Sequence, residues 1–324
     1  MNGAGTAENP YIIMNSDDLY SMTETGGDSI CFSLGADIDL GFTEYAEKFQ
    51  PIPLKCLKFS GNGYMIRNVN LNLPDGSANV FTIVNDTENS TVTIDNLILE
   101  NIRLIGENVF VFASGDNKKY NVSLEYCSFS LNEVVYTSDA KNTNGTRNCL
   151  FHDTNIAMDT DYCTFSAQVD FTKTHPLFSG DIIRHTQIKS EMTTADFLSI
   201  DDRYNAPLSC VTISDSYMFW SIKRRGTGST VSFAMSSVDC NFSRFYMVCE
   251  VISGVSTVYW KGHIGTPCFY DSQVLKKHIS TIKINAGSAA TSSDVKNILG
   301  LTTEQCKDAE YLRSVGFECL GAEV

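Results

Sequence analysis

The strongest constraint on the fold of this 324-residue chain is a succession of short strand-forming runs separated by Asn, Asp, Ser and Gly turns. Most runs place an apolar residue, a polar residue and a second apolar residue in order, as expected for a strand with one buried face. Helical periodicity is confined to the two ends of the chain. The central runs, which together predict an all-β fold, occupy residues 94–99, 122–129, 162–165, 186–188, 210–213, 231–235 and 257–260.

Apolar positions of these runs recur at a loose period. The first series contains Val69, Leu97 and Cys127, at intervals of 28 and 30, and the second contains Phe165, Ile188, Ile213, Met235 and Trp260, at intervals of 23, 25, 22 and 25. A single coil of two or three short strands cannot bury its inward face, so such a period favours coils stacked at about 4.8 Å. Because parallel crossovers are almost always right-handed, we predict a right-handed parallel β-helix. The period allows roughly nine coils between residues 55 and 285.

Two amphipathic segments are predicted to close the solenoid as helical caps. Near the start, Ser16 is expected to cap a helix over residues 17–22 that stops at the glycine pair beginning with Gly26. Near the end, residues 302–305 have the pattern of a capping box and precede apolar residues at helical spacing. The predicted organisation is an N-terminal cap (1–54), the β-helix coils (55–287) and a C-terminal helical cap or anchoring segment (288–324).

The composition excludes several functional classes. A net charge of −14 leaves no basic stripe for nucleic acid, since binding to a phosphate backbone depends on clustered Lys and Arg. The longest apolar runs fall far short of the ~18–20 residues that span a bilayer. The N-terminal sequence MNGAGTAENPYII lacks the charged and apolar regions of a secretory signal. We therefore expect no nucleic-acid binding, no membrane insertion and no signal peptide.

Eleven cysteines are spread along the chain without a CxxC pair. An odd number without metal-ligand spacing fits neither a disulfide framework nor a zinc site. The five histidines show no HxH or HxxxH spacing, and we predict neither a metal nor a cofactor. Cysteines beside aromatic residues, such as Cys127 and Cys163, are interpreted as small buried hydrophobes of a protein that folds in a reducing cytoplasm.

The first third of the chain carries an ordered set of motifs. The sequence GTAENPYII at residues 5–13 is followed by CFSLGADIDL at 31–40, Pro-Ile at 51–52 and FSGNGYMIRNV at 59–69. This order resembles the N-terminal signature of right-handed β-helix proteins found in bacteriophage virions and in bacterial surface adhesins. Ile66 sits one position earlier than in that family pattern. The resemblance covers about residues 3–115 and is specific for fold rather than for activity.

The resemblance implies an auxiliary virion component, either a head fibre or decoration protein or a tail appendage. The expected absence of a signal peptide and the many thiols favour the phage branch over the adhesin branch. We therefore predict a non-enzymatic virion structural protein that folds in the host cytoplasm and acts as a rigid rod. Its implied partners are other virion proteins, a cell-surface glycan or receptor, and further copies of the chain, since homotrimers are common among such phage proteins. A tailspike-like polysaccharide depolymerase and a glycan-binding adhesin remain as alternatives.

The enzymatic alternative requires two carboxyl groups, one protonated and one ionised, about 5–9.5 Å apart. Asp159 and Asp161 are two residues apart on a predicted strand and would share one face. Asp201 and Asp202 form a second candidate pair. Acids in such turns are more commonly solvated than catalytic, so no residue is assigned a catalytic role.

Aspartates at two positions have the spacing of oxygen ligands for a cation. Asp37 and Asp39 belong to the Asp-Ile-Asp-Leu strand of the N-terminal signature. We interpret them as residues that form hydrogen bonds or face solvent within the cap, and we predict no metal there.

Aromatic residues close to arginines form the strongest candidate binding surface. The residues are Tyr217, Trp220, Arg224, Arg225, Tyr259 and Trp260. Alternate residues of a strand point outward, and exposed Tyr, Trp and Arg suit either a sugar platform or a protein interface. An interpretation of most of them as core or trimer-contact residues is equally consistent with the pattern.

The Gly61-Asn62-Gly63 turn is interpreted as a corner of the scaffold. It lacks the Lys-Ser/Thr of a P-loop and the strand–turn–helix context of a dinucleotide site. Asn and Gly instead supply the positive φ angles of a tight turn. The sequence therefore predicts that the N-terminal cap meets the first coil here.

Overall fold

The computed structural model of the chain is mostly β, and the ladders between its described strands are parallel. It describes residues 1–41, 50–137, 149–171, 177–194, 208–209, 211–224, 230–232, 241–253, 257–259, 263–264, 268–273, 281–283 and 298–314. Strands make up 58% and helices 9% of the structure, which confirms the predicted all-β, solenoid-like parallel fold. Contacts divide the chain into two compact units, residues 1–168 (unit 1) and 169–324 (unit 2), and each is described by itself.

The first strand stack of unit 1 consists of six short strands, each paired in parallel with the next. In stacking order they are β1 (Tyr11–Ile13), β2 (Cys31–Leu34), β5 (Lys58–Ser60), β7 (Thr91–Asp95), β9 (Tyr120–Glu125) and β11 (Ile156–Asp161). One buried column runs through the registers of β2 to β11, formed by Phe32, Phe59, Ile94, Leu124 and Thr160. Each coil thus buries its inward face only through the coils next to it.

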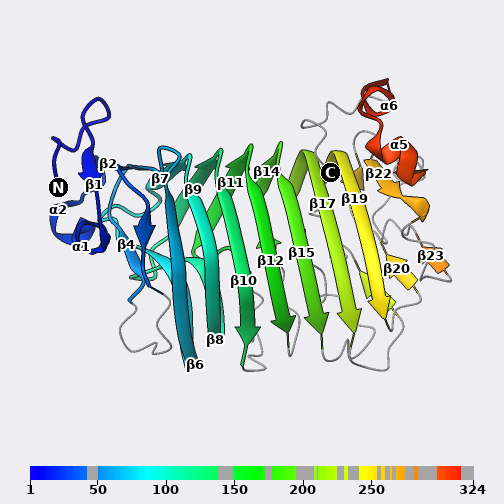
Figure 1. Cartoon of the computed structure of the whole chain (residues 1–324), viewed down its shortest axis with the longest axis horizontal. Helices are drawn as coiled ribbons and strands as arrows, with labels where there is room; N and C mark the ends of the chain where they lie inside the picture. The colour runs from blue at the N-terminus through cyan, green and yellow to red at the C-terminus, as the bar shows by residue number, and fades with distance from the viewer. Residues whose placement is uncertain are drawn as a thin grey trace. The chain divides into compact units, whose positions relative to one another are not determined.

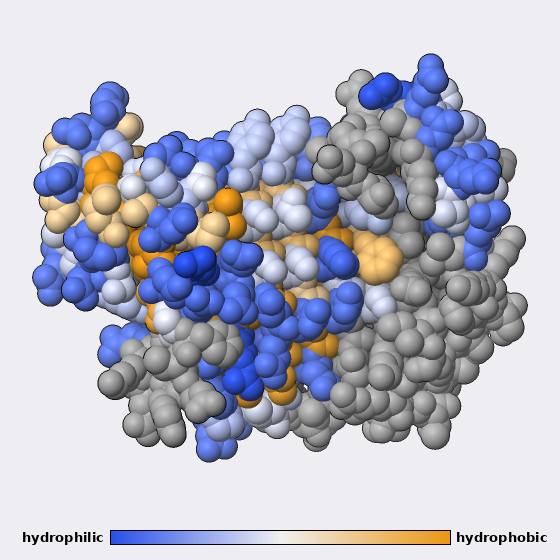
Figure 2. Space-filling model, in the orientation of Figure 1, coloured by the Kyte–Doolittle hydropathy of each residue, from blue (hydrophilic) through white to orange (hydrophobic). Residues whose placement is uncertain are grey.

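Longer strands form the other two walls of unit 1. One wall contains β3 (Ile38–Asp39), the first half of β6 (Met65–Ile83), the first half of β8 (Ile98–Ser114) and β10 (Ser128–Tyr136). The other contains β4 (Ile52–Leu54) and the second halves of β6 and β8. Strands β6, β8 and β10 run side by side (Figure 1). Hydrophilic and hydrophobic side chains are interspersed over their outer face (Figure 2).

The core of unit 1 is rich in phenylalanine. The rings of Phe81 and Phe112 stack at 5.3 Å on adjacent strands, and Phe129 and Phe151 lie 5.6 and 4.6 Å from Phe165. All five are buried. Phe165 belongs to β12 (Thr164–Phe171), which pairs with β10. Full burial of one phenylalanine side chain contributes roughly 1.5–3 kcal/mol to stability, so these five residues are a main source of the stability of unit 1.

Unit 2 repeats the parallel arrangement. Its main ladder contains β14 (Ile182–Arg184), β15 (Gln187–Thr194), β17 (Thr212–Arg224), β19 (Asn241–Ser253), β21 (His263–Ile264), β22 (Cys268–Asp271) and β24 (Ile298–Leu301). Two smaller ladders join β13 (Phe178–Ser179) to β16 (Leu208–Ser209), and β18 (Thr230–Ser232) to β20 (Thr257–Tyr259) and β23 (Thr281–Lys283). Strands β15, β17 and β19 lie side by side (Figure 1).

The predicted spacing of the second series is wrong. Ile213 pairs with Ile183, and Ile188 pairs with Met218, so Ile188 and Ile213 occupy different positions in neighbouring coils. Both pairs have the same sequence separation, 30, as the hydrogen bond from the amide of Thr186 to the hydroxyl of Ser216. Met235 and Trp260 lie outside the described residues. A coil of unit 2 therefore contains about 30 residues rather than the predicted 22 to 25, and longer coils mean fewer of them than predicted.

In unit 1 the first series is half correct. Val69 pairs with Ile102 rather than with Leu97, whereas Leu97 and Cys127 do occupy equivalent positions, since Ser128 donates its amide to the carbonyl of Leu97. Every second residue of a strand faces inward, so several registers place apolar residues together. Side-chain alternation alone therefore did not determine which coil positions match.

Short helices lie at both ends of the chain. Asn15, and not Ser16, caps α1 (Ser16–Tyr20), because its side chain accepts the amide of Asp18. A second turn, α2 (Met22–Thr25), ends at Gly26 as predicted. The parallel pairing of β1 with β2 already lies within residues 1–54.

At the C-terminal end the predicted capping box is confirmed. Thr302 and Gln305 exchange both bonds at the start of α5 (Thr303–Lys307). Asp308 then interrupts the helix and accepts the amides of Glu310 and Tyr311 in α6 (Ala309–Ser314). Two short helices thus replace the single one predicted. No helix among the described residues is long and apolar enough to cross a membrane.

Candidate functional site

A row of left-handed residues forms one corner of the coils. In unit 1, the residue after each of β7, β9 and β11 has a positive φ angle: Asn96 (49°), Tyr126 (54°) and Tyr162 (52°). The amide of Asn96 donates to the carbonyl of Glu125, and the amide of Tyr126 donates to that of Asp161. The same backbone turn is therefore stacked coil upon coil.

Gly61-Asn62-Gly63 forms this corner in the coil of β5, as predicted. Asn62 and Gly63 have φ angles of 52° and 80°. Gly61 has a different role, because a Cβ atom there would lie 2.3 Å from the Cα of Leu97 in the next coil. Gly61 thus allows the close approach of two backbones, whereas Gly63 allows the positive φ angle.

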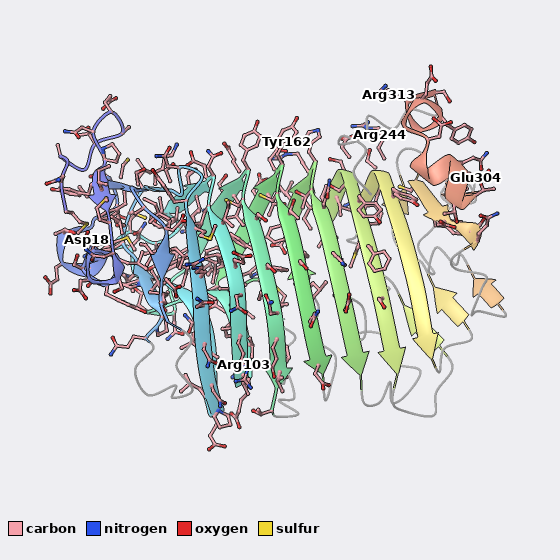
Figure 3. All side chains as sticks on the ribbon, viewed as in Figure 1. Asp18, Arg103, Tyr162, Arg244, Glu304 and Arg313 are labelled. Atoms are coloured by element: carbon pink, nitrogen blue, oxygen red, sulfur yellow. The ribbon has the colours of Figure 1, made fainter. Side chains whose placement is uncertain are left out.

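Tyr126 and Tyr162 are the prominent side chains of the corner, which we name the tyrosine corner. They are 59% and 44% exposed, and their rings stack at 5.1 Å with an interplanar angle of 8°. The side chain of Tyr162 projects outward beyond the strand ends (Figure 3). Asn96 performs the same turn without an aromatic ring.

The tyrosines are not the residues that the backbone prefers. A left-handed conformation costs an ordinary residue roughly 1–2 kcal/mol, and Asn or Gly adopts it more readily. The favourable stacking of the two rings offsets about 0.5–1.5 kcal/mol of this conformational cost. Two exposed tyrosines held at strained positions therefore indicate a surface that displays aromatic groups.

Carboxylates flank the tyrosine corner. Asp159 and Asp161 are both half-buried on β11, while Met158 and Thr160 are buried, so the predicted sharing of one outer face is confirmed. Asp161 pairs in register with Glu125, the exposed residue that precedes Tyr126. The outer face beside the two rings is therefore acidic.

The acidic row continues along the stack. Glu125 pairs in register with Asp95, whose Oδ2 lies 2.5 Å from the Nζ of Lys58. The geometry thus combines aromatic edges, phenol hydroxyl groups and carboxylates on one ridge of unit 1.

The predicted aromatic and arginine surface is only partly described. Tyr217 is half-exposed on β17, and its ring lies 5.2 Å from that of the buried Tyr246. Trp220 and Arg224 lie on β17 and Tyr259 on β20, but their side chains lie outside the described residues. Arg225, Trp260, Asp201 and Asp202 also lie outside them. The six residues remain a predicted surface.

Asp37 and Asp39 have structural roles, as interpreted from the sequence. Asp37 accepts the amide of Met65 at 3.1 Å, and Asp39 accepts the side chain of Asn68 at 2.8 Å and the amide of Gly41 at 2.9 Å. Hydrogen bonds from Asn68 and then Gly41 lower the pKa of Asp39 below its usual value. The row of side-chain hydrogen bonds continues with Asn101, whose Nδ2 donates to the Oδ1 of Asn68.

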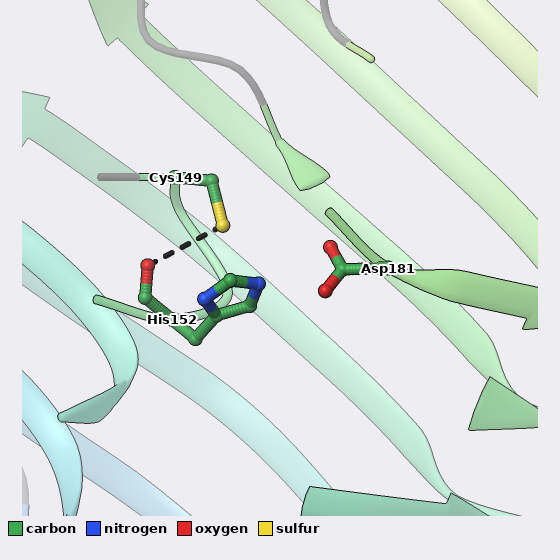
Figure 4. Close-up of side chains that lie close together, drawn as sticks. All are labelled: Cys149, His152 and Asp181. Carbon is green, nitrogen blue, oxygen red and sulfur yellow. Dashed lines mark hydrogen bonds between the residues drawn. The ribbon is translucent and has the colours of Figure 1, made fainter. Parts of the chain in front are cut away.

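The cysteines whose side chains the structure describes are buried thiols, which confirms their interpretation as core residues. They are Cys31, Cys56, Cys127, Cys149, Cys163 and Cys268. The Cys149 thiol donates to the carbonyl of His152 at 3.3 Å (Figure 4), and the Nδ1 of His152 lies 2.7 Å from the carbonyl of Asp153. These bonds hold a turn of unit 1. Asp181, also drawn there, belongs to unit 2 and accepts the amide of Ser179 at 2.8 Å.

Sequence reasoning missed the tyrosine corner, although a signal for it exists. Glu125-Tyr126-Cys127-Ser128-Phe129 and Asp161-Tyr162-Cys163-Thr164-Phe165 are two versions of one motif in successive coils. The cysteines were interpreted as core residues and Asp161 was considered only as half of a carboxylate pair, whereas Glu125 and the two tyrosines were not considered. A buried Cys-x-Phe preceded by Tyr places that tyrosine at the turn.

Comparisons with known proteins give little guidance. No family model matches the chain, and no curated protein matches it. A solved structure described as "a putative immunoglobulin A1 protease from Bacteroides ovatus" is similar with a TM-score of 0.43 and 12% sequence identity, over 97% of this chain and 89% of that chain. At this level the likeness carries no argument about function.

Proposed function

We propose that the chain is a right-handed parallel β-helix that serves as a non-enzymatic structural protein of a bacteriophage virion, as a head fibre, decoration or tail appendage. The stacked, in-register strands of each unit support the coil architecture. The N-terminal motif series at residues 5–69 supports the virion assignment by resemblance. The observation that carries a binding role is the exposed, stacked pair of Tyr126 and Tyr162.

The proposed mechanism is mechanical. Stacked coils resist bending because each strand is hydrogen-bonded on both sides, and the scaffold holds the tyrosine corner in a fixed position. Its partners are other virion proteins, and a cell-surface glycan or receptor at the tyrosine corner. Tyrosine suits both kinds of partner, since it combines an apolar ring with a hydroxyl group. Free, buried thiols are compatible with folding in the reducing host cytoplasm, before incorporation into the particle as single chains or homotrimers.

The binding role is tested with the full chain on host cells or on the host's purified surface glycan. We expect Tyr126→Asn with Tyr162→Asn to reduce binding at least tenfold, because Asn retains the turn and removes both rings. Tyr311→Ala in α6 is the control and should bind as the unmodified chain does. Unchanged binding by the double variant would remove the tyrosine corner from the proposal. Absence of the protein from purified particles by mass spectrometry would overturn the virion assignment.

A polysaccharide depolymerase is the second candidate, favoured by the shared face of Asp159 and Asp161. Residues two apart on a strand are separated by about 6.6 Å, within the range of inverting glycosidases. We expect the unmodified chain to release no reducing ends from host capsule or lipopolysaccharide. Release that is abolished by Asp159→Asn or Asp161→Asn, in variants with unchanged circular dichroism, would replace the structural proposal with an enzymatic one.

A further inference from the structure

Two buried thiols lie directly behind the tyrosine corner. Cys127 and Cys163 follow Tyr126 and Tyr162, and they are 2% and 1% exposed. Glu125 pairs in register with Asp161, and the amide of Thr164 donates to the carbonyl of Cys127 at 2.8 Å. The pairing and the hydrogen bond define the same register, so the two cysteines occupy equivalent positions in adjacent coils.

The two thiols make the same contacts, one coil apart. The Cys127 thiol lies 3.5 Å from the carbonyl of Ile94 and 3.4 Å from that of Glu125. The Cys163 thiol lies 3.5 Å from the carbonyl of Leu124 and 3.3 Å from that of Asp161. Leu124 belongs to the coil of Cys127, so the Cys163 sulfur already points toward that coil. A hydrogen bond also joins the two thiols to each other.

The backbone separation suits a covalent link. Equivalent positions of neighbouring parallel strands lie about 4.8 Å apart. Disulfide-bonded cysteines have Cα–Cα distances of about 4.4–6.8 Å. The bridge therefore needs no change in coil register.

We propose that Cys127 and Cys163 are an oxidisable dithiol that forms a disulfide between adjacent coils when the protein meets a low-molecular-weight disulfide. The Cys163 thiolate attacks the small disulfide, which forms a mixed disulfide at Cys163 and releases one small thiolate. The Cys127 thiolate then attacks the Cys163 sulfur, forms the Cys127–Cys163 bond and releases the second small thiolate. The protein loses two hydrogen atoms, and the small disulfide is reduced to two thiols.

The chain contains a matched pair that should not react in this way. Cys31 and Cys56 are also buried and free in adjacent coils. Cys31, however, pairs in register with Lys58, two residues beyond Cys56. Cys56 lies in a bend before β5 begins at Lys58, so Cys31 and Cys56 do not occupy equivalent positions of neighbouring coils, whereas Cys127 and Cys163 do. The register thus distinguishes two pairs of equal burial.

The proposed exchange should be slow at neutral pH. The hydrogen bond with Cys163 and burial both raise the pKa of Cys127, whereas the hydrogen bond with Cys127 lowers the pKa of Cys163. Cys163 therefore reacts first, and the closing step by Cys127 limits the rate. Only the thiolate attacks a disulfide. While the pH is below the pKa of Cys127, the thiolate fraction of this residue rises about tenfold per pH unit. We expect the rate of bond formation to rise steadily from pH 7 to pH 9 in the folded protein.

The test uses the full chain, prepared reduced and incubated with 2-hydroxyethyl disulfide, both as folded protein and during refolding from denaturant. Non-reducing peptide mapping by mass spectrometry should show a peptide that links residues 127 and 163, and none that links 31 and 56. Cys163→Ser should leave Cys127 as a thiol or as a mixed disulfide with the reagent. Free thiols or separate mixed disulfides at both positions in both conditions would overturn the inference, as would equal linkage of the control pair.

The inference does not depend on the proposed function, since its test needs only the purified chain. For a virion protein it has a consequence. Transfer from the reducing cytoplasm to an oxidising exterior would link the two coils that carry the tyrosines. The oxidised form should then show slower proteolysis at the tyrosine corner than the reduced form.

Discussion

Replacing Asn85 with alanine is expected to loosen the contact between two coils of unit 1. Asn85 is 1% exposed, its Oδ1 accepts the amide of Cys56 at 2.9 Å, and its Nδ2 donates to the carbonyl of Cys56 at 3.0 Å. The Nδ2 also donates to the hydroxyl of Ser90 at 3.1 Å. The side chain thus satisfies both backbone groups of a buried residue 29 positions earlier in the chain.

The magnitude follows from the groups left without partners. Each buried backbone group that loses its hydrogen bond costs about 1–3 kcal/mol, so the two groups of Cys56 together cost about 2–6 kcal/mol. Since 1.4 kcal/mol corresponds to a factor of ten, local opening should become roughly 30- to 20,000-fold more frequent. This loss is large beside the total stability of about 5–15 kcal/mol that is usual for a domain.

Hydrogen exchange of the peptide around Cys56 is the most direct assay, because it reports the affected amides. Asn121→Ala is the control, since Asn121 is exposed and donates a single bond to the carbonyl of Asn89. The control should change stability by less than about 0.5 kcal/mol. Exchange at Cys56 that is equally slow in Asn85→Ala and in the unmodified chain would refute the reasoning.

Three further predictions concern the corner and the pH dependence. In urea unfolding, Gly61→Ala should lower the unfolding free energy by more than about 2 kcal/mol, because the added Cβ would overlap the next coil. A Cβ at Gly63 would meet no atom within 4 Å, so Gly63→Ala should cost only the left-handed penalty of about 1–2 kcal/mol. Replacing Tyr126 and Tyr162 together by Asn should change the unfolding free energy by less than about 1 kcal/mol, since relief of strain offsets the lost stacking, and a loss above about 2 kcal/mol would show that the rings are structural. Burial alone raises the pKa of Asp28, but hydrogen bonds from one threonine side chain and two backbone amides hold it below its usual value. The stabilisation from Asp28 is therefore complete above about pH 5 and is lost as the pH falls below about 4, and Asp28→Asn should flatten that part of the thermal-midpoint profile.

Local signals in the sequence were sufficient where the physics is local. The capping box of Thr302 and Gln305 and the positive φ angle of Asn62 depend on residues within one turn, and both were predicted. Asn15 and Ser16 are both good capping residues in neighbouring positions, so the sequence did not determine which of them caps α1.

The register of the coils depends on contacts between distant residues and was less predictable. Val69 and Leu97 are both apolar and buried, yet they lie at different positions of their coils. The orientation of Tyr126 depends on a left-handed turn, which sequence propensity assigns to Asn or Gly rather than to tyrosine. The duplicated Tyr-Cys-x-Phe motif would have indicated the missed position.

The proposal places the gene for this chain in a phage genome, and cryo-EM of purified particles of such a phage tests it most directly. The proposal predicts density for a parallel β-helix attached to the head or tail, with the strand register of each unit and with the stacked rings of Tyr126 and Tyr162 on an accessible corner. Particles without this density, from a phage whose infected host contains the folded protein, would contradict the proposal that the chain is a virion component.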